Sequence, residues 1–324
     1  MNLTSRRTLL TLLLTFVSPV LLAQDAFPSR PVKIIVPFAV GGGVNTMVEI
    51  MRAAITRELG QPLVAEYRPG AAGMVGVQAL LNAPADGYTL LLHSTSLASG
   101  QAINPTPGFD ARTDLKPISN LAFSSFALVV SKNVPAKTLP ELVAYANANP
   151  GKLNYASTGI GGSTHLAAEL MKQALGNIPI VHIPYKASGA VITAIASGEI
   201  DMTMEFPNNM KAHVDAGSGR FLAIAAKQRD PLIPDVPIFS EAGFPAVEIG
   251  AWLALFGPAK LADPIADKLQ AAFAKAAKDP QVVERFRQVG YSSIGSTREQ
   301  LAQQLSADTI RYTALVKSAN IKAQ

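Results

Sequence analysis

The sequence predicts an α/β protein whose parallel sheets are covered by helices. Short apolar runs rich in β-branched residues alternate with segments of helical periodicity, which is typical of parallel sheets. Two of the runs lead at once into a glycine-rich loop and then a helix. The chain has 324 residues, enough for about two domains, and contains no linker long enough to join two independent ones. We therefore expect two domains that share strands or are built from discontinuous segments.

The N-terminal segment has the pattern of an export signal. Arg6 and Arg7 precede the apolar run 8–17, and Ala23 offers a small residue for cleavage. The run is short for a membrane anchor and is followed by Pro19. We expect residues 1–23 to be a signal peptide cleaved near Ala23. The arginine pair leaves both the general secretory and the twin-arginine routes open.

The stretch 34–45 is the first candidate site. Ile34, Ile35 and Val36 are typical of a buried strand, which Pro37 stops. Three glycines follow, and a helical pattern begins at once. A strand, a glycine-rich turn and a helix N-terminus together direct free backbone N–H groups at one point, where an anion can bind. The alternative is a tight turn with no ligand.

Helical and strand patterns then alternate. Apolar residues recur at helical spacing from Met47 to Leu59, and Gly60 follows where a helix typically ends. Thr138 and Glu141 have the spacing of a capping box. In order, we expect helix 47–59, strand 62–67, a helix ending near 82, strand 88–93, strand 126–131, helix 138–148, strand 153–156 and helix 165–175. There follow strand 180–183, a helix ending at 198, strand 200–206, helix 207–216, strand 221–226, the apolar run 249–256, a helix from 263 and helix 297–318.

The loop 157–164 repeats the arrangement of the first candidate site. It carries four hydroxyls, on Ser157, Thr158, Ser163 and Thr164, beside a helix start. Hydroxyl and backbone N–H donors suit a carboxylate. The alternative is simple N-capping by Ser163 or Thr164. Because ligands of open α/β sheets bind at the carboxyl ends of the strands, we expect the two loops to face each other across a cleft.

Composition and motifs exclude several classes of protein. Cysteine is absent, which excludes disulfides and thiolate ligands, and the four histidines lack metal-ligand spacing, so no metal or cofactor is expected. Basic and acidic residues, 28 and 23 in number, are scattered, which does not suggest nucleic-acid binding. Ser157, His165 and Asp201 have no spacing that fixes a catalytic triad. An exported α/β enzyme acting on a small organic acid, with His165 or Lys186 as the acid–base residue, remains the alternative function.

Eight motifs in order point to a family. They are FPSRPVKIIVPFAVGGG (27–43), GQPLVAEYRPGAAG (60–73), ADGYTLL (85–91), PAKTLPEL (135–142), PGKLNYAS (150–157), HIPYK (182–186), LIPDVP (232–237) and EAGFP (241–245). With them the chain resembles the Bug-type, or TctC-like, receptors. These are the extracytoplasmic solute-binding proteins of tripartite tricarboxylate transporters. The resemblance covers essentially all of the chain after the signal.

The resemblance implies a two-lobed periplasmic binding protein of type II, a Venus flytrap with discontinuous domains. Lobe 1 would comprise 24–122 and 227–324, and lobe 2 would comprise 123–226. The receptor would be a monomer with no catalytic residue. Its partners would be a small carboxylate, the subunits of a membrane transporter and, as an alternative, a sensor kinase. The ligand class stays open among aliphatic dicarboxylates, aromatic acids and heteroaromatic acids.

The resemblance also implies which residues surround the ligand. They are Phe38, Val40, Gly41, Gly42, Gly43, Asn45, Ser94, Ser157, Thr158, Gly161, Gly162, Ser163, Thr164, His165, Tyr185, Ala187, Glu205 and Phe206. Some departures from the usual pattern stand out. Val40 replaces a proline, Asn45 stands near the place of an aspartate, and Ala187 replaces a glycine. Because Asn45 is neutral, we expect a ligand without an ammonium group at that end.

Overall fold

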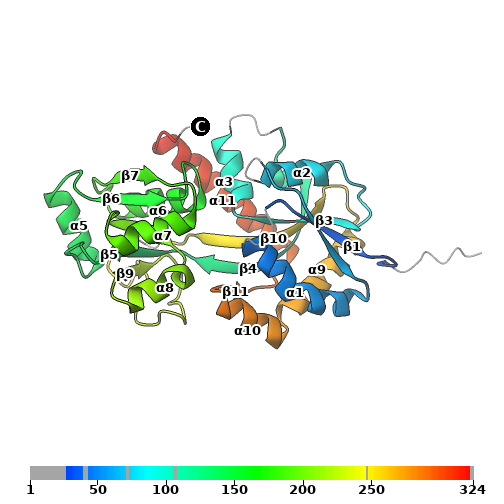
Figure 1. Cartoon of the computed structure of the whole chain (residues 1–324). Coiled ribbons are helices and arrows are strands. Elements are labelled where there is room, and N and C mark those ends of the chain that lie inside the picture. The colour runs from blue at the N-terminus through cyan, green and yellow to red at the C-terminus, as the bar shows by residue number, and fades with distance from the viewer. Residues whose placement is uncertain (1–26, 39–42, 71–72, 105–107, 246, 322–324) are drawn as a thin grey trace, which may run out of the picture.

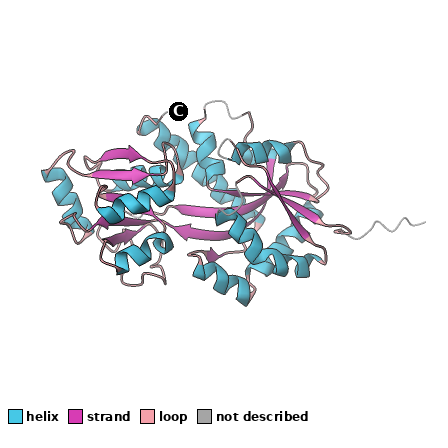
Figure 2. Cartoon of the chain, in the orientation of Figure 1, coloured by secondary structure: helices cyan, strands magenta, loops and turns pink. Residues whose placement is uncertain are grey.

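A computed structural model describes residues 27–38, 43–70, 73–104, 108–245 and 247–321. They form two lobes, each built on one sheet and joined by long central strands (Figures 1 and 2). The expected signal peptide and its cleavage position lie outside the described residues. Within the described ranges, no helix combines the length and the apolar character needed to cross a membrane.

The first sheet has six strands in the order β11-β4-β10-β3-β1-β2. Their bounds are β1 Val32–Val36, β2 Leu63–Tyr67, β3 Thr89–Ser94, β4 Leu115–Ser125, β10 Gly250–Pro258 and β11 Ser292–Ser293. Strand β1 runs parallel to β2 and β3, whereas β10 runs antiparallel to β3 and β4. The carboxyl ends of β1, β2 and β3 therefore share one edge, and β10 ends at the opposite edge.

Helices cover both faces of this sheet. One face packs against α1 (Gly43–Leu59), α9 (Asp263–Ala277) and α10 (Pro280–Gln288). The other packs against α2 (Met74–Leu81), α3 (Ser96–Ile103), α4 (Ala111–Asp114) and α11 (Arg298–Ser318). The apolar positions of α1, such as Met47, Ile50 and Met51, are buried as their helical spacing predicts.

The second sheet has five strands in the order β7-β6-β8-β5-β9. They are β5 Ala127–Ser131, β6 Asn154–Ser157, β7 Val181–Pro184, β8 Met202–Glu205 and β9 Gly219–Ile224. Strand β6 is parallel to β7 and β8, and β5 is antiparallel to both of its neighbours. The connecting helices are α5 Leu139–Ala148, α6 Ser163–Ala174, α7 Ser188–Ser197 and α8 Pro207–Asp215.

The chain passes between the two sheets twice. It leaves the first sheet through Phe126, between β4 and β5, and returns through the segment between β9 and β10. These crossings are hydrogen-bonded to each other: Phe126 N–H donates to Ile249 O (3.2 Å), and Ala225 N–H donates to Phe126 O (2.8 Å). The predicted two-lobed α/β fold is confirmed: the first sheet draws its strands from two separate segments of the chain, and the second sheet comes from one continuous segment.

Several helix ends follow the sequence signals. Thr297 and Gln300 form a capping box at the start of α11, and Thr138 caps α5. Gly60 and Gly198 have φ values of 68° and 83°, the left-handed conformation that suits glycine after a helix. The Glu141 carboxylate, however, accepts from Lys137 N–H, one residue before the N-cap. Strand β4 and helix α3 have no counterpart among the predicted elements.

Candidate ligand-binding site

The described residues of the expected ligand site lie at or just after the carboxyl ends of five strands. In the first lobe they follow β1 and β3, and in the second lobe they follow β6, β7 and β8. Gly43 is the first residue of α1. Val40, Gly41 and Gly42 lie outside the described residues, so their expected ligand role stays a prediction.

Phe38, Asn45 and Ser94 form the first-lobe side. The Phe38 ring meets the His93 ring edge-on, with centroids 5.4 Å apart. The Asn45 side-chain oxygen accepts a hydrogen bond from the Tyr67 hydroxyl, so its amide nitrogen is the polar group left for other partners. The Ser94 hydroxyl lies 2.8 Å from that of Ser96.

His93 is a buried support beneath this side. Its Nδ1 accepts a hydrogen bond from the Ser94 backbone N–H at 2.9 Å, and burial lowers the pKa of the imidazole to about 4. A Cβ on Gly73 would lie 2.4 Å from its Nε2, so the chain can approach His93 here only as glycine. His93 therefore stays neutral at pH 7 and packs closely against Gly73, in the loop before α2.

Ser157 is fully buried at the end of β6. Its Oγ lies 2.7 Å from His182 Nε2 and accepts from Gly159 N–H at 3.2 Å. The hydroxyl thus binds inside the protein and shapes the loop that leads into α6. The sequence did not predict a role for His182. Ser157, its partner, lies 25 residues away, and only the pairing of β6 with β7 brings the two side chains together.

The loop 157–164 closes on itself. Thr158 N–H donates to Thr164 Oγ1 at 2.9 Å, and the two hydroxyls lie 3.0 Å apart. Helix α6 begins at Ser163 with Gly162 as its N-cap, and no side chain caps it. The alternative in which Ser163 or Thr164 is the N-cap is therefore wrong, since Thr164 Oγ1 bonds back to the loop. The first-turn N–H groups of α6 remain available to a ligand.

His165 belongs to a stack of rings under this loop. Its Nδ1 accepts from Gly161 N–H at 3.0 Å, its ring lies 4.1 Å from that of His182, and the His182 ring lies 4.7 Å from that of Tyr155. Burial lowers the pKa of His165, and burial followed by the nearby His165 lowers that of His182 to about 4. Both imidazoles therefore support the loop as neutral groups.

The triad considered from the sequence is not assembled. Asp201 accepts from the backbone N–H of Asn154, at the opposite end of β6 from Ser157. His165 contacts the Gly161 backbone, and the partner of the Ser157 hydroxyl is His182.

Tyr185 and Ala187 lie on the rim of the second lobe. The Tyr185 hydroxyl donates to Glu199 Oε1 at 2.7 Å. Because Glu199 follows the end of α7, the hydroxyl points along that helix and away from its N-terminus. Ala187 is the exposed N-cap residue of α7 and leaves that terminus without a side-chain cap.

Glu205 is 1% exposed at the end of β8. Its carboxylate accepts from the Ser188 hydroxyl (2.6 Å), Phe206 N–H (2.9 Å) and Asn209 Nδ2 (3.1 Å). It thus ties the starts of α7 and α8 together, and the N-terminal ends of both helices favour its negative charge.

Phe206 stacks on Phe126 with centroids 4.4 Å apart and lies 6.1 Å from the ring of Tyr291, which comes from the first lobe. Burial, and then the charge of Glu205, raise the pKa of Tyr291 to about 12. Aromatic rings from both lobes therefore meet beside the crossing at Phe126.

The lobes also touch at two smaller contacts. A Cβ on Gly161 would lie 2.3 Å from Ile103 Cδ1, at the end of α3. On the other side, Asn208 Nδ2 donates to Val289 O at 3.0 Å, and a Cβ on Gly290 would lie within 2.7 Å of three Asn208 atoms. Neither pair was expected from the sequence, since each joins segments far apart in the chain.

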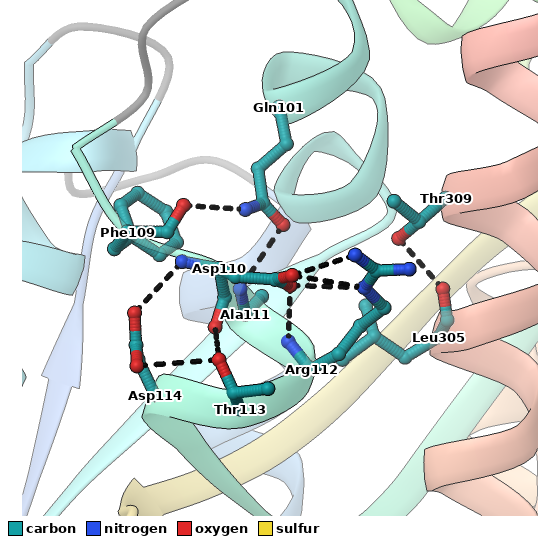
Figure 3. Close-up of polar contacts among 9 residues, drawn as sticks. All are labelled: Gln101, Phe109, Asp110, Ala111, Arg112, Thr113, Asp114, Leu305 and Thr309. Carbon is teal, nitrogen blue, oxygen red and sulfur yellow. Dashed lines mark hydrogen bonds and ion pairs between the residues drawn. The ribbon is translucent and has the colours of Figure 1, made fainter.

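One side chain links helix α3, which carries Ile103, to the segment before β4. Gln101 Nε2 donates to Phe109 O at 2.9 Å, and Gln101 Oε1 accepts from Ala111 N–H at 3.3 Å (Figure 3). Asp110 caps α4 next to this pair. The first-lobe surface that faces Gly161 is thereby fixed to the start of β4.

Helices that begin at the two edges of the sheets differ in whether a side chain caps their N-terminus. Side chains cap α4, α5, α10 and α11, whereas α2, α3, α6, α7 and α8 have none. Each of these five begins after the carboxyl end of a parallel strand. The uncapped α9 instead follows the antiparallel β10 and begins at the other edge. The site edge thus presents several helix starts whose backbone donors suit a carboxylate.

Comparison with known proteins shows the family of the chain. The model of the tripartite tricarboxylate transporter family receptor, TctC, matches residues 48–321. A Pseudomonas protein from the tcbD-tcbE intergenic region is 32% identical, over 99% of this chain and 96% of its own. BugT of Bordetella pertussis is 31% identical over 93% of this chain and 92% of its own.

Solved structures show the same architecture. MatC from Rhodopseudomonas palustris with bound malate is 29% identical, with a TM-score of 0.73 over 90% of this chain and 100% of its own. A second R. palustris protein, with adipate, is 27% identical, with a TM-score of 0.76 over 91% of this chain and 99% of its own. The chain belongs to the TctC family of periplasmic solute-binding receptors, which are binding proteins and not enzymes.

Proposed function

We propose that the protein captures a small carboxylate between its lobes and delivers it to the membrane subunits of a tripartite tricarboxylate-type transporter. The uncapped start of α6 carries this proposal, because its N–H groups lie in the loop 157–164 and opposite the first lobe at Ile103. The malate and adipate in the related structures support a carboxylate as the ligand class.

Closure would follow from contacts that the ligand makes to both lobes. The lobes are 24–122 with 227–324, and 123–226, and they move about the crossings at Phe126 and at the segment before β10. The ligand shifts the equilibrium toward the closed form by the difference between its binding free energies for the closed and the open forms. The buried ring stack under loop 157–164 keeps the N–H groups of α6 in place, so little ordering is needed when the carboxylate arrives.

Asn45 would set part of the specificity. With its oxygen engaged by Tyr67, its side chain offers N–H donors and no negative charge. A carboxylate or hydroxyl fits opposite these donors better than an ammonium group does. We therefore expect unaminated dicarboxylates and hydroxydicarboxylates to bind more tightly than aspartate or glutamate.

The decisive experiment uses Ser163, the first residue of α6. The mature protein is unfolded and refolded to remove any ligand, and malate, succinate, adipate, aspartate and glutamate are titrated by calorimetry. Ser163→Asp places a negative charge at the helix start, which favours the helix but repels a ligand carboxylate. Ser163→Asn is the neutral control of the same shape. We expect Ser163→Asp to lose most of its affinity for the best ligand and Ser163→Asn to keep it. Neither variant should lose stability.

Two results would contradict the proposal. If Ser163→Asp bound the best ligand as tightly as Ser163→Asn, the carboxylate would not lie at α6. If aspartate or glutamate bound best, the inference from Asn45 would be wrong. Transport is distinguished from signalling by co-purification of the closed protein with transporter subunits or with a sensor kinase, each with and without ligand.

A further inference from the structure

Charged side chains are scarce around the proposed ligand site. Among the described residues expected to surround the ligand, Glu205 alone is charged at pH 7, because burial lowers the pKa of His165. The Glu205 carboxylate is 1% exposed and bonds to Ser188, the first residue of α7. A dicarboxylate ligand brings two more negative charges close to it. Because like charges repel at short range, binding a dianion here calls for a nearby cation.

Lys186 is a cation between two anchored residues of the second lobe. One residue before it, Tyr185 N–H donates to Ser157 O at 2.9 Å, at the base of the loop that leads into α6. Two residues after it, the Ser188 hydroxyl donates to Glu205 at 2.6 Å. Lys186 therefore lies between the loop where we propose the first carboxylate and the buried charge of Glu205.

The Lys186 ammonium group has no partner in the part of the chain that the structure describes. The residue is exposed, and its side chain makes no hydrogen bond, ion pair or ring contact with another described residue. Arg68, Lys227 and Arg229 also follow strands that end at the site edge, but each is held in an ion pair, at 2.6, 3.5 and 2.9 Å. The charge of Lys186 is therefore available to a partner that arrives from solution.

The chemistry of lysine suits a charge-selecting role at this position. Its ammonium group is carried on a flexible four-carbon stem, so it can stay with a ligand while the lobes close. A monocarboxylate held by the start of α6 presents only its hydrocarbon end to Lys186 and gains little from the charge. A dicarboxylate presents a second carboxylate, which gains an ion pair.

We propose that Lys186 pairs with the second carboxylate of the ligand and thereby selects dicarboxylates over monocarboxylates. This inference rests on the proposed function, because it takes the first carboxylate to lie at the start of α6. Lys186 is thus a specificity-determining residue of the same site. It acts from the second lobe in favour of a second negative charge, whereas Asn45 acts from the first lobe against an ammonium group.

The test measures the affinities of matched acids by calorimetry on refolded, ligand-free protein. Succinate is paired with butanoate and adipate with hexanoate, so that the members of each pair differ only in the second carboxylate. Lys186→Gln should weaken the dicarboxylates about three- to fivefold and the monocarboxylates less than about twofold, whereas Lys186→Arg should keep dicarboxylate binding. The loss should shrink in concentrated salt, because the screening length falls to about 3 Å at 1 M.

Lys132 provides the matched control on the same lobe. It is also exposed, but it follows β5, whose carboxyl end lies at the opposite edge of the sheet. There Ser131 N–H donates to Asp201 O, and Asp201 is four residues, or about 13 Å along the strand, from Glu205. Lys132→Gln should therefore leave the affinities for all four acids unchanged.

Two results would overturn the proposal. Unchanged dicarboxylate affinity in Lys186→Gln would mean that Lys186 is a solvated surface charge, and equal losses for monocarboxylates would mean a general attraction for anions. Ser163→Asp distinguishes this failure from failure of the proposed function. If Ser163→Asp weakens the dicarboxylates and Lys186→Gln does not, the site at α6 stands and only the role of Lys186 fails. If Ser163→Asp has no effect, the carboxylate does not lie at α6 and both proposals fail.

Discussion

Replacing Gly290 by alanine should weaken ligand binding by holding the lobes apart. Gly290 has φ +80°, and an added Cβ would lie 2.5 Å from Asn208 Cγ and 2.7 Å from Asn208 Cβ. A change of side-chain rotamer cannot move Asn208 Cβ away, so the backbones must separate. The bond from Asn208 Nδ2 to Val289 O is then lost. Such a bond is worth about 0.5–1.5 kcal/mol, so the affinity for the carboxylate should fall about two- to tenfold.

Gly60→Ala is the matched control. Gly60 also follows a first-lobe helix, has φ +68° and has no atom within 4 Å of the added Cβ. Both substitutions place alanine in the left-handed region, which costs about 1–2 kcal/mol of stability. Urea unfolding should show a loss of this size for Gly60→Ala and a larger one for Gly290→Ala, which also loses the Asn208–Val289 bond, whereas calorimetry should show weaker ligand binding only for Gly290→Ala. Equal ligand affinities of the two variants would refute the idea that closure depends on the Asn208–Gly290 contact.

Three further predictions concern stability. Thr297→Ala should cost about 1 kcal/mol in urea unfolding, since it removes the N-cap of α11; Ser306→Ala, within the same helix, should cost less. Gln101→Leu should cost about 1–3 kcal/mol, because Phe109 O and Ala111 N–H both lose their partner, and Gln303→Leu on the surface of α11 is the control. The third concerns pH: the folded-state pKa of His182 lies at about 4, below the unfolded value of 6.5, so its contribution to stability is present above pH 6.5 and is lost as the pH falls toward 4. Over that window the stability of His182→Gln should fall less steeply than that of the wild type, by about 1.4 kcal/mol per pH unit; equal slopes would contradict the burial of a neutral imidazole.

Local signals foretold most of the regular elements, because these depend on short-range rules. Thr297 and Thr138 start helices, and Gly60 and Gly198 end them, as their residue types predict. Strand β4 was missed because it contains Lys116, Pro117 and several serines, and its conformation depends on pairing with β10 across more than a hundred residues. Helix α3 was missed because Ser96, Ser99 and Gly100 are weak helix formers.

The sequence predicted which loops form the candidate site, but it did not predict the side-chain contacts that support them. The uncapped start of α6 follows from the glycines and hydroxyls of its own loop. The supports beneath it do not: His182 reaches Ser157 only through the pairing of two strands, and Tyr291 reaches Phe206 from the other lobe. Single-sequence patterns carry no record of such pairs. A buried serine and an exposed serine look alike in the sequence, so the burial of Ser157 and its contact with His182 could not be predicted; its contact with a ligand stays a prediction.

The backbone hydrogen bonds between the two crossings limit how the lobes can move relative to each other. Phe126, Ala225 and Ile249 bond to one another through their backbones, so the lobes are joined by a narrow ribbon of sheet. A ribbon of this kind resists stretching and sliding, because either would break its bonds, but it twists and bends at low cost. We therefore expect lobe movement to be limited to bending and twisting about this ribbon. Because bending and twisting break none of these bonds, we expect the receptor to close on a ligand and reopen with the ribbon intact.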